Sequence, residues 1–159
     1  MYHTRELQQY LNKIKIHKGD IIHIPSGTVH SVSGYAELYE VQRNCNITYR
    51  VYDKFNRKLD IERAVQNFKN NSIKIKNKQA GVLIKNKYYI LERLNNIENK
   101  IIETKTKSIF LTIISGIGRI ITKEDIIDIK QGMTLLIPAK LRKIKIMGKD
   151  LDILKTTYK

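Results

Sequence analysis

The stretch GDIIHIPSGTVH, residues 19–30, reads as a short strand enclosed by turn-forming residues. Gly19 brings the chain out of a turn, and the residues after it alternate in the way that places apolar side chains on one face of a strand. Pro25 and Gly27 then bend the backbone sharply, and His30 follows after two further residues. The spacing is Gly, five residues, Pro, one residue, Gly, two residues, His. It predicts a strand and bend that present His30 as a metal ligand.

A second informative stretch, Thr-Tyr-Arg-Val-Tyr-Asp over residues 48–53, contains Arg50, which comes twenty residues after His30. Taken with the first stretch, the whole run from Gly19 to Arg57 resembles the type I mannose-6-phosphate isomerases of the cupin superfamily. The resemblance is to the carboxyl-terminal half of these enzymes. It implies a mainly β, cupin-like (jelly-roll) architecture with few short helices.

The resemblance also implies a function and a site. The family interconverts mannose 6-phosphate and fructose 6-phosphate with zinc, which stabilises the negative charge that develops during proton transfer. By position in the motif, His30 is expected as a zinc ligand and Arg50 as a catalytic residue. The family's other zinc ligands lie before the region that corresponds to Met1, so this chain is expected to hold an incomplete site. The alternative is a non-catalytic cupin remnant that acts as a binding or structural module.

Other side chains offer further contributions to this site. Glu40 is a candidate metal contact, or else an acceptor that orients a ligand or pairs with Arg50. His23 is a candidate replacement ligand, or else a partly exposed strand histidine. For Arg50 the alternative is an ion pair with Asp53 or Glu40, and for His30 it is a buried histidine in a strand turn. The general base and the residues that grip the substrate phosphate are not identified.

A faded copy of the first motif occurs near the carboxyl end. Gly132 and Pro138 repeat the first Gly and the Pro at the same spacing, but Lys140 and Lys143 stand where Gly27 and His30 stood. Lysine is a poor zinc ligand at neutral pH, so this copy is not expected to bind metal. The predicted organisation is therefore half of a catalytic cupin barrel over 1–68, a polar linker over 69–80, and a smaller non-metal cupin-like domain over 81–159.

Hydrophobic periodicity predicts mostly short strands. Helices are expected over 4–11 and 60–68, where apolar residues recur at helical spacing and Asp60 is a plausible N-cap. The strands expected in the first part cover 14–16, 21–24, 29–32, 36–43 and 47–52. Those expected in the second part cover 81–84, 88–94, 108–115, 118–122, 125–129, 133–137, 143–147 and 151–156, with glycines separating several of them.

The formal net charge of +15 lies mostly in the second part. Ten basic and seven acidic side chains occur up to Phe68, against 20 and eight after it. Lysines alternate with isoleucines, as in Ile73–Lys76, and this pattern favours amphipathic strands with a solvated lysine face over a nucleic-acid surface. Aromatic content is 8%, and no nucleic-acid-binding motif is present. A nucleic-acid partner is therefore not expected.

Location and partners follow from composition and from the incomplete site. No apolar run is long enough to span a membrane and no secretory leader is evident, so a cytoplasmic protein without a membrane partner is expected. The single Cys45 excludes an intrachain disulfide, which agrees with a reducing compartment. A half-barrel would expose sheet edges and an apolar face. The expected partners are therefore a sugar-phosphate substrate and either a second copy or a complementing amino-terminal half.

Overall fold

The computed structural model describes residues 7–77 and 80–159 and divides into two compact units, Met1–Asn77 and Lys78–Lys159. Strands account for 44% of the described residues and helices for 9%, so the predicted mainly β fold class is confirmed. The boundary falls within the segment expected as a linker, which also contains one short strand.

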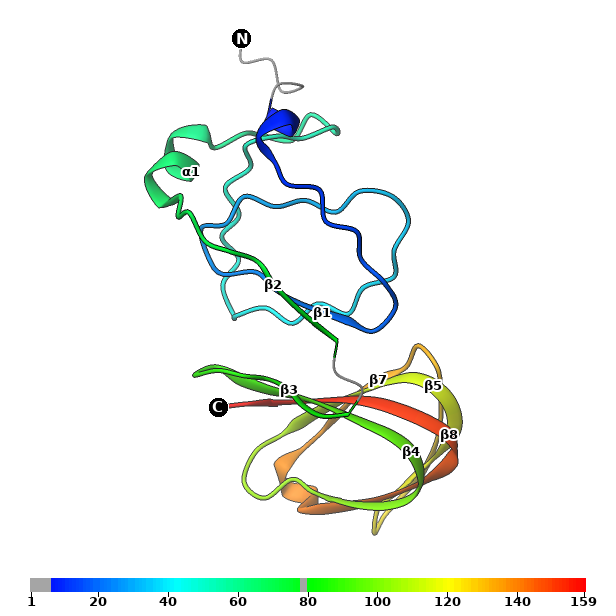
Figure 1. Ribbon diagram of the computed structural model, residues 1–159. Coiled ribbons are helices and arrows are strands. Elements are labelled where there is room, and N and C mark those ends of the chain that lie inside the picture. The colour runs from blue at the N-terminus through cyan, green and yellow to red at the C-terminus, as the bar shows by residue number, and fades with distance from the viewer. Residues whose placement is uncertain (1–6, 78–79) are drawn as a thin grey trace. The chain divides into compact units, whose positions relative to one another are not determined.

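The first unit contains little regular structure (Figure 1). It has a turn of 3-10 helix, η1 (Leu7–Tyr10), the strand β1 (Asp20–His23), the helix α1 (Ile61–Asn67) and the strand β2 (Lys74–Asn77). β1 and β2 pair antiparallel, with Ile22 opposite Ile75. Long irregular segments connect these elements.

Several strands predicted in this unit are wrong. Residues 14–16, 29–32, 36–43 and 47–52 form no strand, whereas the strand at 21–24 is confirmed as β1 and the helix at 60–68 as α1. The helix predicted over 4–11 is a single 3-10 turn from residue 7, and its first residues lie outside those described. A strand needs a neighbouring strand to satisfy its backbone hydrogen bonds, and in the described part of this unit only β1 and β2 pair with each other. The four other segments have no such neighbour, so their alternating side chains were not enough to make them strands.

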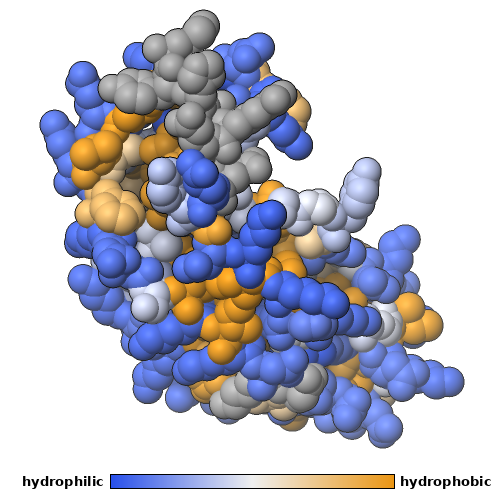
Figure 2. Space-filling view, turned by 45° about the horizontal axis from the view of Figure 1, so that its top comes forward, coloured by the Kyte–Doolittle hydropathy of each residue, from blue (hydrophilic) through white to orange (hydrophobic). Residues whose placement is uncertain are grey.

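None of the described residues of the first unit is buried. Apolar side chains reach the molecular surface in Figure 2 as orange patches among polar ones. In the first unit the large exposed apolar residues are Tyr10, Ile14, Ile24, Val32, Tyr35, Leu38, Tyr39, Ile47, Tyr52, Phe55, Val65, Phe68 and Ile75. This unit therefore has no hydrophobic core of its own among the described residues.

The second unit is an antiparallel sheet of six strands, in which β4, β5 and β8 are long and curved (Figure 1). Its elements are β3 (Gly81–Lys85), β4 (Tyr89–Glu103), β5 (Ile109–Ile121), β6 (Ile126–Lys130), β7 (Thr134–Ile137), the 3-10 turn η2 (Ala139–Leu141) and β8 (Lys143–Tyr158). The strand order is β3-β4-β8-β5-β6, and β7 also pairs with β5.

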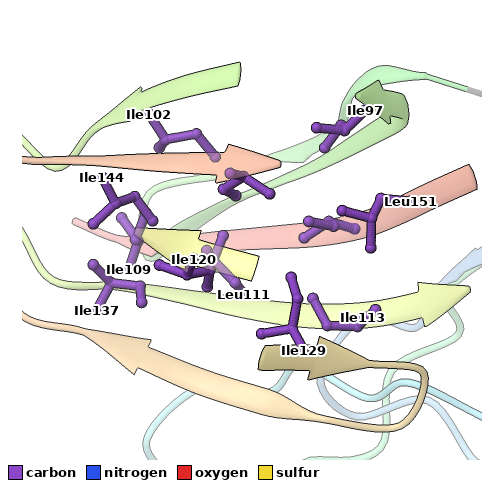
Figure 3. Packing of buried hydrophobic residues seen from close by; sticks show 12 residues of the cluster. Ile97, Ile102, Ile109, Leu111, Ile113, Ile120, Ile129, Ile137, Ile144 and Leu151 are labelled. Atoms are coloured by element: carbon purple, nitrogen blue, oxygen red, sulfur yellow. The ribbon is translucent and has the colours of Figure 1, made fainter. Parts of the chain in front are cut away.

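A cluster of twelve buried aliphatic residues fills the interior of the second unit (Figure 3). They come from five strands and are Ile97, Ile102, Ile109, Leu111, Ile113, Ile120, Ile129, Ile137, Ile144, Ile146, Leu151 and Ile153. Burying one such side chain contributes roughly 1.5–3 kcal/mol, so this cluster is the main source of stability in the described chain.

Glycines lie inside β5 and β8, and they explain why the four strands predicted over these two regions are in fact two long strands. Boundaries between strands were expected near Gly116, Gly118 and Gly148, yet β5 and β8 continue through these glycines. Gly118 lies opposite Gly148, and a Cβ on Gly148 would stand 2.2 Å from Leu151 Cδ1. Gly116 has a φ of +85° beside an irregularity in the ladder. Here glycine permits close backbone approach at bulges instead of ending the strand.

Candidate functional site

The motif of residues 19–30 forms a strand and a turn, as its spacing predicts. Gly19 has a φ of +92° and leads directly into β1. After the strand, the backbone N–H of Thr28 donates to the carbonyl of Pro25 at 3.2 Å, and Gly27 has a φ of +87°. Both glycines thus occupy left-handed conformations that other residues adopt only with strain. This backbone places His30 just beyond the turn.

The segment after α1 braces this turn. The N–H of Lys69 donates to the Gly27 carbonyl at 3.0 Å, and the Asn71 amide nitrogen donates to the Ser26 carbonyl at 3.2 Å and to Thr28 Oγ1 at 3.3 Å. A Cβ on Gly27 would lie 2.6 Å from the carbonyl oxygen of Asn67, which leaves no room for a side chain there. Sequence reasoning missed Asn71, because it lies in a polar stretch that looked like a linker.

His30 is exposed, and one of its two ring nitrogens is engaged. Nδ1 lies 2.9 Å from the carbonyl oxygen of Thr28. A carbonyl only accepts, so this contact favours the tautomer in which Nδ1 carries the proton and Nε2 keeps its lone pair. Metal-binding histidines commonly have this arrangement, in which a backbone carbonyl orients the ring. His30 is therefore chemically suited to supply one ligand, and it is not the buried histidine of the alternative interpretation.

Arg50 is half-buried and is tied to α1 through its backbone. The N–H of Asp60, the residue before the helix, donates to the Arg50 carbonyl at 2.9 Å. Within the described ranges no ion pair involves the Arg50 guanidinium, and the recorded ion pair of Asp53 is with Arg57. The alternative in which Arg50 pairs with Asp53 is therefore wrong. A guanidinium that forms no ion pair within the protein can bind an anionic group of a ligand.

Asp53 organises the turn that follows Arg50. Its carboxylate accepts hydrogen bonds from Arg57 Nε at 2.7 Å, from the Arg57 backbone N–H at 2.9 Å and from the Phe55 N–H at 2.8 Å. The side-chain hydrogen bond from Arg57 is the main cause that lowers the pKa of Asp53 from 3.8 to about 2, and the two backbone donors add to it. Asp53 is thus a structural carboxylate that stays ionised at neutral pH.

The remaining predicted ligands do not gather into a metal site. His23 is an exposed residue of β1 opposite Lys74, and Glu40 is exposed in an irregular segment instead of on the expected strand face. Among the residues that the structure describes, no three His, Cys, Asp or Glu side chains lie close enough to hold a metal ion. Zinc sites need about three or four protein ligands. The described residues therefore do not fit a zinc ion by themselves.

The faded motif of the second unit repeats the backbone of the first without its chemistry. Gly132 has a φ of +86° and precedes the four-residue strand β7, just as Gly19 precedes β1. Pro138 then begins η2. Lys140 and Lys143, which replace the glycine and histidine of the first motif, are exposed.

Two comparisons in sequence bear on the identity of the chain. No protein-family model matches it. It is 26% identical to mannose-6-phosphate isomerase ManA of Bacillus subtilis, over 93% of this chain and 52% of that protein. It is 24% identical to the mannose-6-phosphate isomerase of Streptococcus mutans, over 91% of this chain and 50% of that protein. The chain is a homologue of mannose-6-phosphate isomerases. It spans about half the length of the curated relatives that it matches.

A solved structure supports the same relationship at the level of the fold. The structure from Archaeoglobus fulgidus, provisionally assigned as a mannosephosphate isomerase, is 17% identical and has a TM-score of 0.54. The similarity covers 63% of this chain and 33% of that one. This likeness is one of fold alone, and it agrees with the mainly β class predicted from the sequence. Among the described residues no helix has the length and apolar character to cross a membrane.

Proposed function

We propose that this chain supplies one half of a zinc-dependent mannose-6-phosphate isomerase, which interconverts mannose 6-phosphate and fructose 6-phosphate in the cytoplasm. The observation that carries the proposal is the sequence similarity to proteins of that name over more than nine tenths of this chain. The proposed domain organisation is half of a catalytic barrel over 1–68, a linker over 69–80 and a non-metal cupin-like domain over 81–159.

Within the complete site, His30 and Arg50 have separate roles. His30 would serve as one zinc ligand through Nε2, and the Thr28 carbonyl would orient its ring. The remaining ligands come from a complementing amino-terminal half. The Arg50 guanidinium holds negative charge on the sugar phosphate, either at the reacting oxygens or at the phosphate, because a guanidinium offers several N–H donors to an anionic group.

The exposed apolar side chains of the first unit support the need for a complementing half. Thirteen large apolar residues there are exposed, and a single pair of four-residue strands is too small a sheet to be stable alone. The matched relatives contain about as much chain again beyond the matched part. A polypeptide that corresponds to this remainder would cover the apolar residues and extend the β1–β2 sheet. A second copy of this chain is the other partner that could cover these apolar residues, and it is to be tested as well.

The experiment is to co-express this chain with the unmatched amino-terminal part of Bacillus subtilis ManA and to measure conversion of mannose 6-phosphate with zinc present. The purified complex should be active, and this chain alone should not. Arg50→Ala should lower kcat/KM by about 10²–10³, the range found when a charge-stabilising donor is removed. Arg63→Ala, at an exposed arginine of α1, is the matched control and should leave kcat/KM unchanged.

Zinc content tests the role of His30 separately from turnover. His30→Ala should reduce the zinc bound by the purified complex, whereas His17→Ala should not, since 66% of the His17 side chain is exposed and its ring lies 3.7 Å from Asp20. A stable, zinc-loaded complex with no turnover would contradict the isomerase proposal and favour the non-catalytic module. Turnover by this chain alone as a dimer would contradict complementation.

A further inference from the structure

An open pocket in the second unit lies where β5, β6 and β8 run side by side. Its volume is about 690 Å³, within the range of roughly 300–1,000 Å³ typical of small-molecule sites. Ten residues line it: Ile117, Gly118, Arg119, Asp128, Ile129, Lys130, Met133, Met147, Gly148 and Lys149. All of them belong to the second unit, so the pocket does not depend on how the two units are placed.

Strand register places an apolar side chain between two cations at this pocket. Ile117 of β5 lies opposite Lys130 of β6 on one side and opposite Lys149 of β8 on the other. Directly opposed residues of an antiparallel sheet project from the same face, and neighbouring strands are about 4.8 Å apart. The two lysines therefore flank Ile117, which is 66% exposed.

The next set of directly opposed residues on the same face contains a cation whose charge is neutralised. Arg119 lies between Asp128 and Met147, and Arg119 Nε donates to Asp128 Oδ1 at 2.8 Å. No ion pair neutralises Lys130 or Lys149 within the ranges that the structure describes. The pocket thus combines two cations that have no acidic partner with apolar groups, including a Met147 that is 39% exposed.

We propose that this pocket binds a small amphiphilic anion, namely a phosphate monoester attached to an apolar body. The phosphate would lie between Lys130 and Lys149, and the apolar body would cover Ile117 and Met147. A neutral apolar ligand would leave the ammonium groups without a counter-charge, and a fully hydrated anion would leave the apolar surface in water. The proposal concerns the second unit alone and is independent of the isomerase proposal.

Two of the three methionines in the chain line the pocket, which allows a site-specific test. The full chain is labelled with ¹³C-methyl methionine and titrated with hexyl phosphate, and the signals are assigned with Met133→Leu and Met147→Leu. The signals of Met133 and Met147 should shift and saturate. Hexanol and inorganic phosphate, which each offer one half of the ligand, should bind about tenfold more weakly.

The variant that tests the charges is Lys130→Gln combined with Lys149→Gln. It should weaken hexyl phosphate binding about tenfold, since each exposed charge contributes modestly. Lys143→Gln, an exposed lysine of β8 outside the pocket, should bind like the unmodified chain. Absence of saturable shifts at Met133 and Met147, equal affinity for hexanol, or unchanged binding by the double variant would each overturn the proposal.

Discussion

Gly148 lies where an added side chain would collide with its neighbours. A Cβ there would stand 2.2 Å from Leu151 Cδ1 and 2.6 Å from the Ile117 carbonyl oxygen. Gly148→Ala should therefore lower the free energy of unfolding by up to about 3 kcal/mol, the usual scale for overpacking. Urea unfolding followed by circular dichroism measures this loss.

Gly132→Ala is the matched comparison, because no atom lies within 4 Å of its Cβ position. Its cost comes only from the φ of +86° and should be about 1 kcal/mol. If the two variants lost equal stability, steric contact at Gly148 would not be the reason for glycine there.

Asp53 gives the turn after Arg50 a defined acid sensitivity. Its folded-state pKa of about 2 lies below the ordinary 3.8, so its contribution to stability is complete above pH 3.8 and is lost as the pH falls towards 2. The amide signal of Arg57, whose N–H donates to this carboxylate, should move in an NMR titration with its midpoint near pH 2. In Asp53→Asn the signal should show no transition there, and a transition retained in the variant would exclude Asp53 as its cause.

Between strands β4 and β8, a largely buried ion pair contributes to how the sheet holds together. Arg93 Nε donates to both carboxylate oxygens of Asp152 at 3.0 Å, and the two side chains are only 19% and 13% exposed. The hydrogen bond to Asp152 raises the pKa of Arg93, so the guanidinium stays charged. Asp152→Ala would remove the carboxylate that hydrogen-bonds this largely buried charge and should cost about 3 kcal/mol in urea unfolding.

The exposed pair on the neighbouring strands is the control. Arg119 and Asp128 join β5 to β6, and their side chains are 64% and 81% exposed. Asp128→Ala should change stability by less than about 1 kcal/mol, because solvent screens the pair. Similar losses in both variants would mean that burial does not decide the value of these ion pairs.

The distribution of buried side chains divides the whole molecule into a stable and a labile unit. Among the residues that the structure describes, all the buried hydrophobic ones lie in the second unit, from Tyr89 to Ile153. Backbone amides of β4, β5 and β8 should therefore exchange with solvent much more slowly than those of 10–77, as measured by hydrogen exchange and mass spectrometry. Adding the amino-terminal part of ManA should slow exchange in 10–77 only, and equal protection of both units in the chain alone would contradict this division.

Sequence patterns predicted the second unit better than the first for a physical reason. The expected strands at 81–84, 125–129 and 133–137 closely match β3, β6 and β7, because their apolar alternation meets a partner on the sheet. In the first unit the segments 36–43 and 47–52 alternate in the same way but have no neighbouring strand. Periodicity reports which face of a strand would be buried, not whether a partner is present.

The sequence by itself determined the relationship to mannose-6-phosphate isomerases, the turn before His30 and the mainly β class, because these depend on glycine, proline and short local spacing. Only the tertiary structure decided the rest. It showed that β5 and β8 run through their glycines, that Asp53 pairs with Arg57 and not Arg50, and that Lys130 and Lys149 flank Ile117. Each of these depends on residues brought together by strand pairing or by competition among charged groups, and local spacing carries no information on either.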